Sequence, residues 1–177
     1  GQTPADLLKR ADIALYRAKD SGRNAIQLFH NSMQHAASER LRLENELRTA
    51  LSRGEFELYF QAQVDARTDQ IIGAEALLRW AHPTLGQQSP ALFIHVLEES
   101  GLILEVGAWV MVEACHACAQ LLEEGIIDER FSLCVNISTR QFRQGDFVER
   151  VEHCLRQNRL PKGCLLYTSD AADDTPC

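Results

Sequence analysis

The residues most suited to chemistry lie in one short segment, residues 73–80, with the sequence GAEALLRW. Alternation along a predicted strand places Glu75, Leu77 and Arg79 on one face. A carboxylate in such an apolar strand is costly to bury unpaired, and a bound divalent cation would offset that cost. Carboxylate oxygens suit hard ions such as Mg²⁺ or Mn²⁺, while the fork of donors on Arg79 suits a phosphate. The pattern alone favours a simple pairing of Glu75 with Arg79 on an exposed strand over such a site.

A second candidate is the pair Cys115 and Cys118, whose C-x-x-C spacing occurs in zinc and redox sites. A structural zinc site needs four ligands, usually as two pairs, and the sequence has no second pair of this kind. Residues 109–122 are expected to form an apolar helix, in which small buried cysteines are ordinary. The pattern therefore favours a core role, with a structural zinc module as the alternative.

Alternating strands and helices must position these residues. Strands are expected at residues 57–65, 70–80 and 132–137, and helices at residues 90–100, 104–124 and 146–158. This alternation predicts an α/β fold with parallel strands.

The first 53 residues follow a different pattern. Helices are expected at residues 4–20 and 36–51, with a short strand at residues 25–29 between them. The second helix has one apolar face and many charges on the others, which is typical of a connector between domains.

Composition limits the function classes. The 177 residues are 45% hydrophobic and 24% charged, with a net charge of −7, which is usual for a globular protein. These values exclude a disordered tail, a collagen-like fibre and a broad surface for a nucleic acid polymer. The most apolar stretch, residues 102–122, is interrupted by Glu105, Glu113 and His116, so no membrane segment is predicted within it. A cytoplasmic location is expected, with any membrane anchor of a longer parent lying upstream.

The motif EALLRW resembles the signature of the EAL family of cyclic di-GMP phosphodiesterases. Further blocks of the family are similar to residues 57–65 (ELYFQAQVD), 89–94 (SPALFI), 98–103 (EESGLI), 107–110 (GAWV), 135–138 (VNIS) and 141–142 (QF). The blocks follow one another in the family's order between about residues 43 and 163.

This resemblance implies a (β/α)₈-type barrel with one antiparallel strand, of which residues 54–163 would form the N-terminal half. It also implies hydrolysis of one phosphodiester bond of cyclic di-GMP to linear pGpG with Mg²⁺ or Mn²⁺. By position, Glu75 and Asn136 would be metal ligands, and Gln61 and Arg79 would contact the dinucleotide. From the residues alone, Asn136 is better interpreted as a polar strand end.

Two residues depart from the family pattern. Ala62 and His95 stand where the family commonly has proline. Ala62 removes a backbone restraint and no ligand. His95 is expected to be a partly exposed helical residue, and neither change argues against activity.

Residues 11–24 resemble the closing helix and turn of a GGDEF diguanylate cyclase domain. By position, Lys19 and Arg23 would be its nucleotide-phosphate contacts, although a solvated basic helix end explains them locally as well. The resemblances divide the chain into the end of a GGDEF domain (1–30), a connector helix (31–53) and half of an EAL domain (54–163).

Residues 164–177, CLLYTSDAADDTPC, resemble a translated sequencing adapter, and we expect them to be a non-native tail. The EAL family also uses later Glu, Asp and Lys residues that have no counterpart here. We therefore expect a catalytically inactive fragment of a GGDEF–EAL signalling protein, whose parent hydrolyses cyclic di-GMP and forms a homodimer. The alternative is a degenerate EAL domain that senses cyclic di-GMP without cleaving it.

Overall fold

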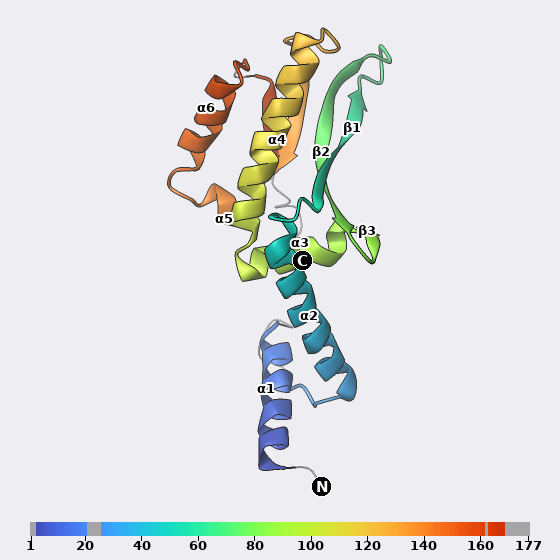
Figure 1. The fold of residues 1–177 in the computed structure, drawn as a ribbon, viewed down its shortest axis with the longest axis vertical. Helices are drawn as coiled ribbons and strands as arrows, with labels where there is room; N and C mark the ends of the chain where they lie inside the picture. Colours follow the sequence, from blue (N-terminus) through green and yellow to red (C-terminus); the bar gives the residue numbers. More distant parts are fainter. Residues whose placement is uncertain (1–2, 21–25, 162, 169–177) are drawn as a thin grey trace. The chain divides into compact units, whose positions relative to one another are not determined.

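The computed structural model describes residues 3–20, 26–161 and 163–168, and the chain divides into two compact units, Gly1–Glu46 and Leu47–Cys177 (Figure 1). In the first unit, α1 spans Pro4–Asp20, as the sequence predicts. Thr3 caps this helix, because its hydroxyl accepts from the Asp6 backbone while the Asp6 carboxylate accepts from the Thr3 backbone.

The second helix is longer than expected. α2 spans Asn31–Ala50, and its first five residues have a single apolar side chain, Met33, so they lack the periodic apolar signal that marks the rest. Residues 26–30 form no strand, so the strand predicted at residues 25–29 is wrong for residues 26–29. Ala25 lies outside the described residues. This segment is short, and the described residues of the first unit contain no strand with which it could pair.

The second unit contains one mixed sheet. Its strands are β1 (Phe56–Val64), β2 (Ile71–His82), β3 (Gly86–Gln88), β4 (Ser132–Asn136) and β5 (Leu165–Thr168). Their order is β1-β2-β4-β5, with β3 on the far end of β2. β1 is antiparallel to β2, whereas β2, β4 and β5 run parallel. The prediction of an α/β fold is confirmed, including the single long antiparallel strand.

Helices cover one face of this sheet. They are α3 (Pro90–Ser100), α4 (Ile103–Glu123), the single turn α5 (Thr139–Phe142) and α6 (Phe147–Gln157). α4 makes the crossover between the parallel strands β2 and β4 and packs on the sheet, with α6 against its outer side (Figure 1).

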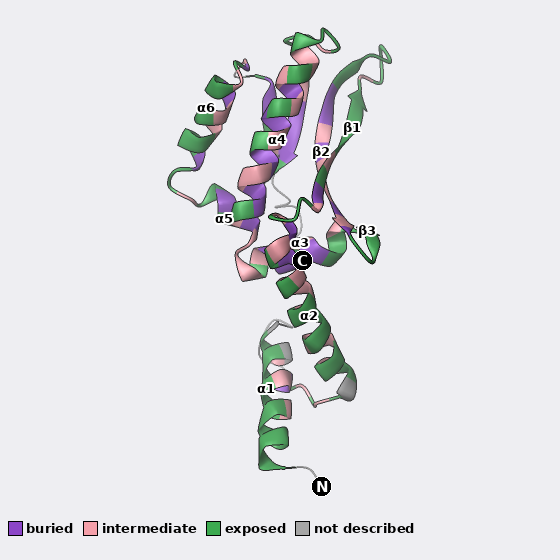
Figure 2. Cartoon of the chain, viewed as in Figure 1, coloured by how far each residue is buried: buried purple, intermediate pink, exposed green. Residues whose placement is uncertain are grey.

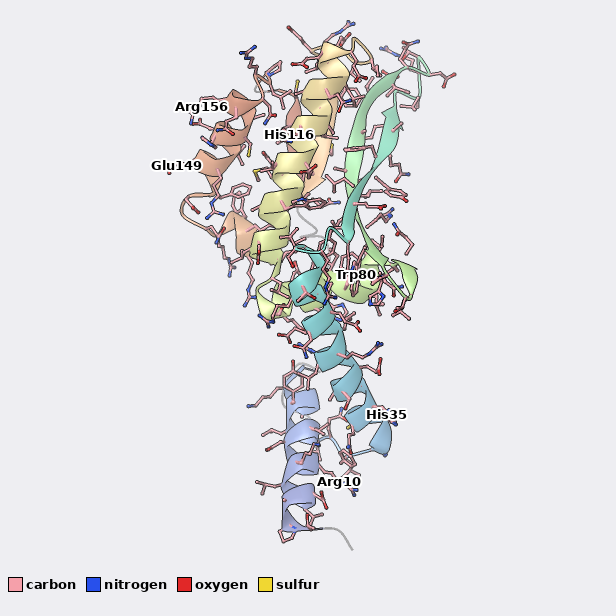
Figure 3. All side chains as sticks on the ribbon, viewed as in Figure 1. Arg10, His35, Trp80, His116, Glu149 and Arg156 are labelled. Carbon is pink, nitrogen blue, oxygen red and sulfur yellow. The ribbon has the colours of Figure 1, made fainter. Side chains whose placement is uncertain are left out.

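The core lies between the sheet and these helices. Ala74, Ala76 and Trp80 of β2 are buried beneath α3 and α4, whereas alternate residues of the same strand are only half-buried (Figure 2). Trp80, labelled in Figure 3, meets the ring of Phe93 edge-on at 5.7 Å and donates a hydrogen bond of 3.0 Å to Glu55. Burial of the indole therefore leaves its polar N–H group satisfied.

Three elements of the sheet unit are absent from the prediction. β3 has three residues and α5 has four, so neither is long enough to show a period. β5 falls within the segment expected to be a non-native tail. Its residues, Leu-Leu-Tyr-Thr, favour extended structure and can pair with the edge of β4 whatever their origin.

The described residues contain no single helix long and apolar enough to cross a membrane. α3 and α4 together pass such a test, but they are bent by 120° at their junction.

Candidate functional site

Strand pairing brings the candidate residues of β1, β2 and β4 to the face of the sheet that the helices leave open. Gln61 of β1 stands directly opposite Glu75 of β2, and Glu75 stands beside Cys134 of β4. Asn136 lies two residues beyond Cys134 and so points to the same side. The sequence predicted which residues these are, and the register explains how residues far apart in the chain meet.

Glu75 and Asn136 are in direct contact. The amide Nδ2 of Asn136 donates a hydrogen bond of 2.7 Å to Oε1 of Glu75, although 61 positions separate them in the chain. Glu75 is half-buried and Asn136 exposed, so both can reach a ligand on the open face. A carboxylate and an amide oxygen side by side suit a hard cation.

Arg79 does not pair with Glu75. Its Nη1 donates to the carbonyl oxygen of Leu78 at 3.0 Å, and its guanidinium lies over the ring of Tyr59, 5.6 Å from the ring centre. Within the part of the chain that the structure describes, no carboxylate is within ion-pair distance of Arg79. The simple pairing favoured by pattern alone is therefore wrong, and most of the five guanidinium donors remain available to an anion.

A cavity of about 440 Å³ opens at the carboxyl ends of β2 and β4. Arg79 and Asn136 contribute to its lining, together with residues of α3, α4 and the segment that follows β4. In parallel α/β folds, this end of the strands is where ligands bind. The cavity is also lined by Ala76 and Leu78 and by apolar residues of α3 and α4, so it lies between the sheet and these helices. It joins Arg79 with Asn136, whereas Glu75 and Gln61 do not line it.

The segment after β4 is held by contacts that the sequence analysis missed. Ser138 and Gln141 form a capping box, in which the Ser138 hydroxyl accepts from the Gln141 backbone and the Gln141 amide oxygen accepts from the Ser138 backbone. Gln141 is buried against Gly107 of α4, where any Cβ atom would collide with its amide. The Ser-x-x-Gln spacing was a sequence signal for this cap.

Arg140 connects the segment after β4 to α3 by hydrogen bonds. Its Nη1 donates to the carbonyl oxygens of Glu98 and Glu99, which are in the last turn of that helix. A cation at a helix carboxyl end also interacts favourably with the helix dipole. Arg140 and Gln141 together therefore fix the end of β4, and with it Asn136.

Gly73 controls how closely β2 and β4 approach. It is paired with Ser132 of β4, and a Cβ atom at this position would overlap the Ser132 backbone oxygen. Beside it, the Gln63 amide and the Cys134 thiol lie 3.6 Å apart, another contact that sequence reasoning did not find. Gly73, the Gln63 amide and the Cys134 thiol are therefore the small or neutral groups that neighbour Glu75 in the sheet.

The two cysteines of the C-x-x-C pair are buried in α4, as the core interpretation predicts. Burial, with smaller contributions from the neighbouring Cys154 thiol, raises the pKa of Cys115 to about 12. Burial and Cys164 raise the pKa of Cys118 to about 11. Both thiols are therefore protonated at neutral pH, which is unfavourable for a nucleophile. The described residues contain no group of three or more His, Cys, Asp or Glu side chains placed to hold a metal, which gives the zinc alternative no support.

The remaining candidates are peripheral to this site. Lys19 is exposed near the end of α1, and Arg23 lies outside the described residues, so their expected role stays a prediction. His95 is exposed on α3, as predicted. Ala62 pairs with Ala74 near the end of the β1–β2 ladder, where a proline would remove a donor.

Comparison with known proteins supports this description. Two proteins of Pseudomonas aeruginosa align with 94% of the chain: the bifunctional diguanylate cyclase/cyclic di-GMP phosphodiesterase MucR, at 40% identity, and the cyclic di-GMP phosphodiesterase NbdA, at 34%. The chain spans 24% and 21% of their respective lengths. A solved structure of the PaMucR phosphodiesterase in complex with c-di-GMP superimposes with a TM-score of 0.68 and 36% identity.

That superposition covers 71% of this chain and 50% of the solved one, as expected for half of a barrel. Residues 44–167 match the family described as the EAL domain. The sheet unit, the paired strands and the order of the motifs agree with this match. The chain belongs to the EAL domain family.

Proposed function

We propose that the chain is part of a GGDEF–EAL signalling protein whose EAL domain hydrolyses cyclic di-GMP to linear pGpG. The observation that carries this proposal is the contact of Glu75 with Asn136, on the same open face as Gln61 and Arg79. MucR and NbdA, whose names include cyclic di-GMP phosphodiesterase activity, support the choice of substrate. The chain covers a quarter or less of those proteins, so the activity is proposed for the parent.

The donor set at this site fits Mg²⁺ or Mn²⁺. Glu75 offers a carboxylate and Asn136 an amide oxygen, both of the hard type that these ions prefer. When bound, the metal would supply a water nucleophile near neutral pH and neutralise phosphate charge. Two protein ligands are too few for a stable site, so further ligands must come from the parent.

The other side chains on this face would bind and orient the dinucleotide. Arg79 lines the cavity and has donors beyond the one bonded to the Leu78 carbonyl oxygen, and a guanidinium fork matches two oxygens of a phosphodiester. Gln61 stands across the ladder from Glu75 and can donate or accept beside it. Their task is to hold the phosphodiester in line for attack, which lowers the entropic barrier of the reaction.

The 177-residue chain itself is proposed to be inactive. Glu75 and Asn136 are the candidate metal ligands in the part of the chain that the structure describes, and that part holds no cluster of three ligating acidic, His or Cys residues. Measurable hydrolysis of cyclic di-GMP by this chain with Mg²⁺ or Mn²⁺ would contradict this.

A second candidate is a non-catalytic sensor of cyclic di-GMP. It is favoured by the fact that Gln61 and Arg79 are groups for binding, whereas the ligand set here is incomplete. The complete reading frame discriminates between the two, because a sensor would lack the later carboxylates that an enzyme needs.

The remaining features of the parent are also proposals. The N-terminal segment, with Lys19 and Arg23, would be the end of a GGDEF domain, which the bifunctional name of MucR supports. We propose a homodimeric parent in the cytoplasm. Residues 164–177 are also proposed to be non-native. The buried Tyr167 hydroxyl supports this, because it has no hydrogen-bond partner among the described residues, whereas the family match to residue 167 and the pairing of β5 with β4 favour a native start of this segment.

The deciding experiment uses the complete protein and its Glu75→Gln variant, assayed for conversion of cyclic di-GMP to pGpG with Mn²⁺. Loss of the ligand charge should lower the rate by about 100-fold, the upper end of the range found when an outer-shell partner of a metal site is removed. Glu149→Gln on the outer helix α6 is the control and should leave the rate unchanged (Figure 3). Equal rates in the wild type and the Glu75 variant would refute the assignment.

A further inference from the structure

Arg79 lies between two possible partners on β1. The strand register places Glu57 directly opposite Arg79 and Tyr59 opposite Leu77, so Tyr59 is the diagonal neighbour. Opposite charges directly across a ladder usually attract one another. The guanidinium nevertheless lies over the Tyr59 ring, 5.6 Å from its centre, and forms no ion pair with Glu57.

This arrangement keeps the hydrogen-bonding edge of the guanidinium free. The Tyr59 ring attracts the cation through its face and takes no carboxylate hydrogen bond from it, so this contact leaves the five N–H donors of the guanidinium for other acceptors. One of these donors, on the terminal nitrogen Nη1, is used by the Leu78 carbonyl oxygen. An ion pair with Glu57 would instead occupy the donors that a phosphate needs and neutralise the charge that attracts it.

Tyr59 is well suited to hold Arg79 in place. Its ring is on the open face of the sheet, the same face as Arg79, with the Arg79 guanidinium carbon over it. A tyrosine side chain has only two rotatable bonds, so it provides a rigid platform at low entropic cost.

We propose that Tyr59 is a positioning residue, which holds the Arg79 guanidinium by its ring face so that the donor edge meets the phosphodiester of the ligand. The identity of that ligand rests on the proposed function. This role requires the aromatic ring of Tyr59 and does not require its hydroxyl group.

The first experiment needs no ligand. In the 177-residue chain, the ¹⁵N relaxation and chemical shift of the Arg79 Nε–H group are measured for the wild type, Tyr59→Phe and Tyr59→Leu. The wild type and Tyr59→Phe should show the same restricted motion and ring-current shift, and Tyr59→Leu should lose both. Unchanged Arg79 signals in Tyr59→Leu would overturn the proposal, and near-identical signals elsewhere show that the fold is intact.

The second experiment tests the consequence for the ligand in the complete protein. Tyr59→Leu should raise KM for cyclic di-GMP by about two- to fivefold with little change in kcat, as expected for loss of a partly exposed cation–π contact. Tyr59→Phe should retain the wild-type KM, whereas a rise in KM for Tyr59→Phe equal to that of Tyr59→Leu would overturn the role of the ring. If wild-type protein does not turn over cyclic di-GMP, the proposed function fails, while the NMR result still decides the placement of Arg79.

Discussion

Asn136 at the end of β4 donates a 2.7 Å hydrogen bond to Glu75 in the middle of β2, and this contact joins two parallel strands at the open face of the sheet. Between these strands the chain passes through α3 and α4, so the contact depends on the correct crossover. The two oxygen-bearing groups are thus preorganised by the fold before any ligand is bound.

Removal of the Asn136 amide should affect activity much more than stability. In the complete protein, Asn136→Ala is expected to reduce hydrolysis of cyclic di-GMP by about 10- to 100-fold, because an oxygen ligand and the partner of Glu75 are lost together. The residue is exposed, so the unfolding free energy should change little. Rates are measured by separation of pGpG, with Gln120→Ala on the outer side of α4 as a control that stays at wild-type level. Similar rates for both variants would exclude a role of Asn136 in the site.

Gly107→Ala should destabilise the sheet unit. The added methyl group would collide with the buried amide of Gln141, so either α4 or the capping box must shift, at a cost of about 1–3 kcal/mol. Urea unfolding of the 177-residue chain measures this cost. Gly145→Ala is the matched control, because no atom lies within 4 Å of a Cβ atom at that position. Equal stability of the two variants would show that Gln141 does not pack as described.

Arg140→Ala should loosen the end of α3. The Glu98 and Glu99 carbonyl groups would lose their cationic donor, and we expect a loss of about 1 kcal/mol in unfolding free energy. Hydrogen exchange should also accelerate for the amides of the following turn at Gly101 and Leu102. Arg143→Ala serves as the comparison, because this arginine is on the same segment and also exposed, but its side chain makes no hydrogen bond to α3 among the described residues. A variant with unchanged exchange rates in this turn would contradict the capping role.

The buried Cys115 thiol should make stability fall at alkaline pH. Burial raises the pKa of this group from 9.0 to about 12, so the folded state holds the proton more tightly than the unfolded state does. The contribution to stability is therefore complete below pH 9 and is lost progressively as the pH rises from 9 toward 12. Urea unfolding at pH 7, 9 and 10 measures this fall, and Cys115→Ala should make it shallower. An identical pH dependence in the variant would rule out Cys115 as its source.

Local signals in the sequence predicted the elements but not their contacts. Pro90 at the first turn and Gly101 after the last residue give the bounds of α3 correctly, and Gly101 has a positive φ of 83° that suits glycine. The contact of Glu75 with Asn136 depends instead on which strands become neighbours. That pairing is set by packing over a long sequence separation, and only the family resemblance indicated it.

The register between β1 and β2 could not be predicted from the local sequence pattern either. Alternation correctly placed Glu75 and Arg79 on one face, but it could not show whether Arg79 meets Glu57, Tyr59 or Glu75. A shift of one residue along β1 would turn Tyr59 and Gln61 to the other face of the sheet. The interpretation of Arg79 as the partner of Glu75 failed for this reason.

The glycine at position 73 has a practical consequence for mutational surveys. It lets the backbones of β2 and β4 come close enough for Asn136 to reach Glu75, although it has no side chain to bind a metal or a nucleotide. Any larger residue would push β2 and β4 apart and so weaken the contact between Asn136 and Glu75. A screen that records only enzymatic turnover would therefore rank Gly73 with the ligands themselves, and only a measurement of the distance between the strands would tell them apart.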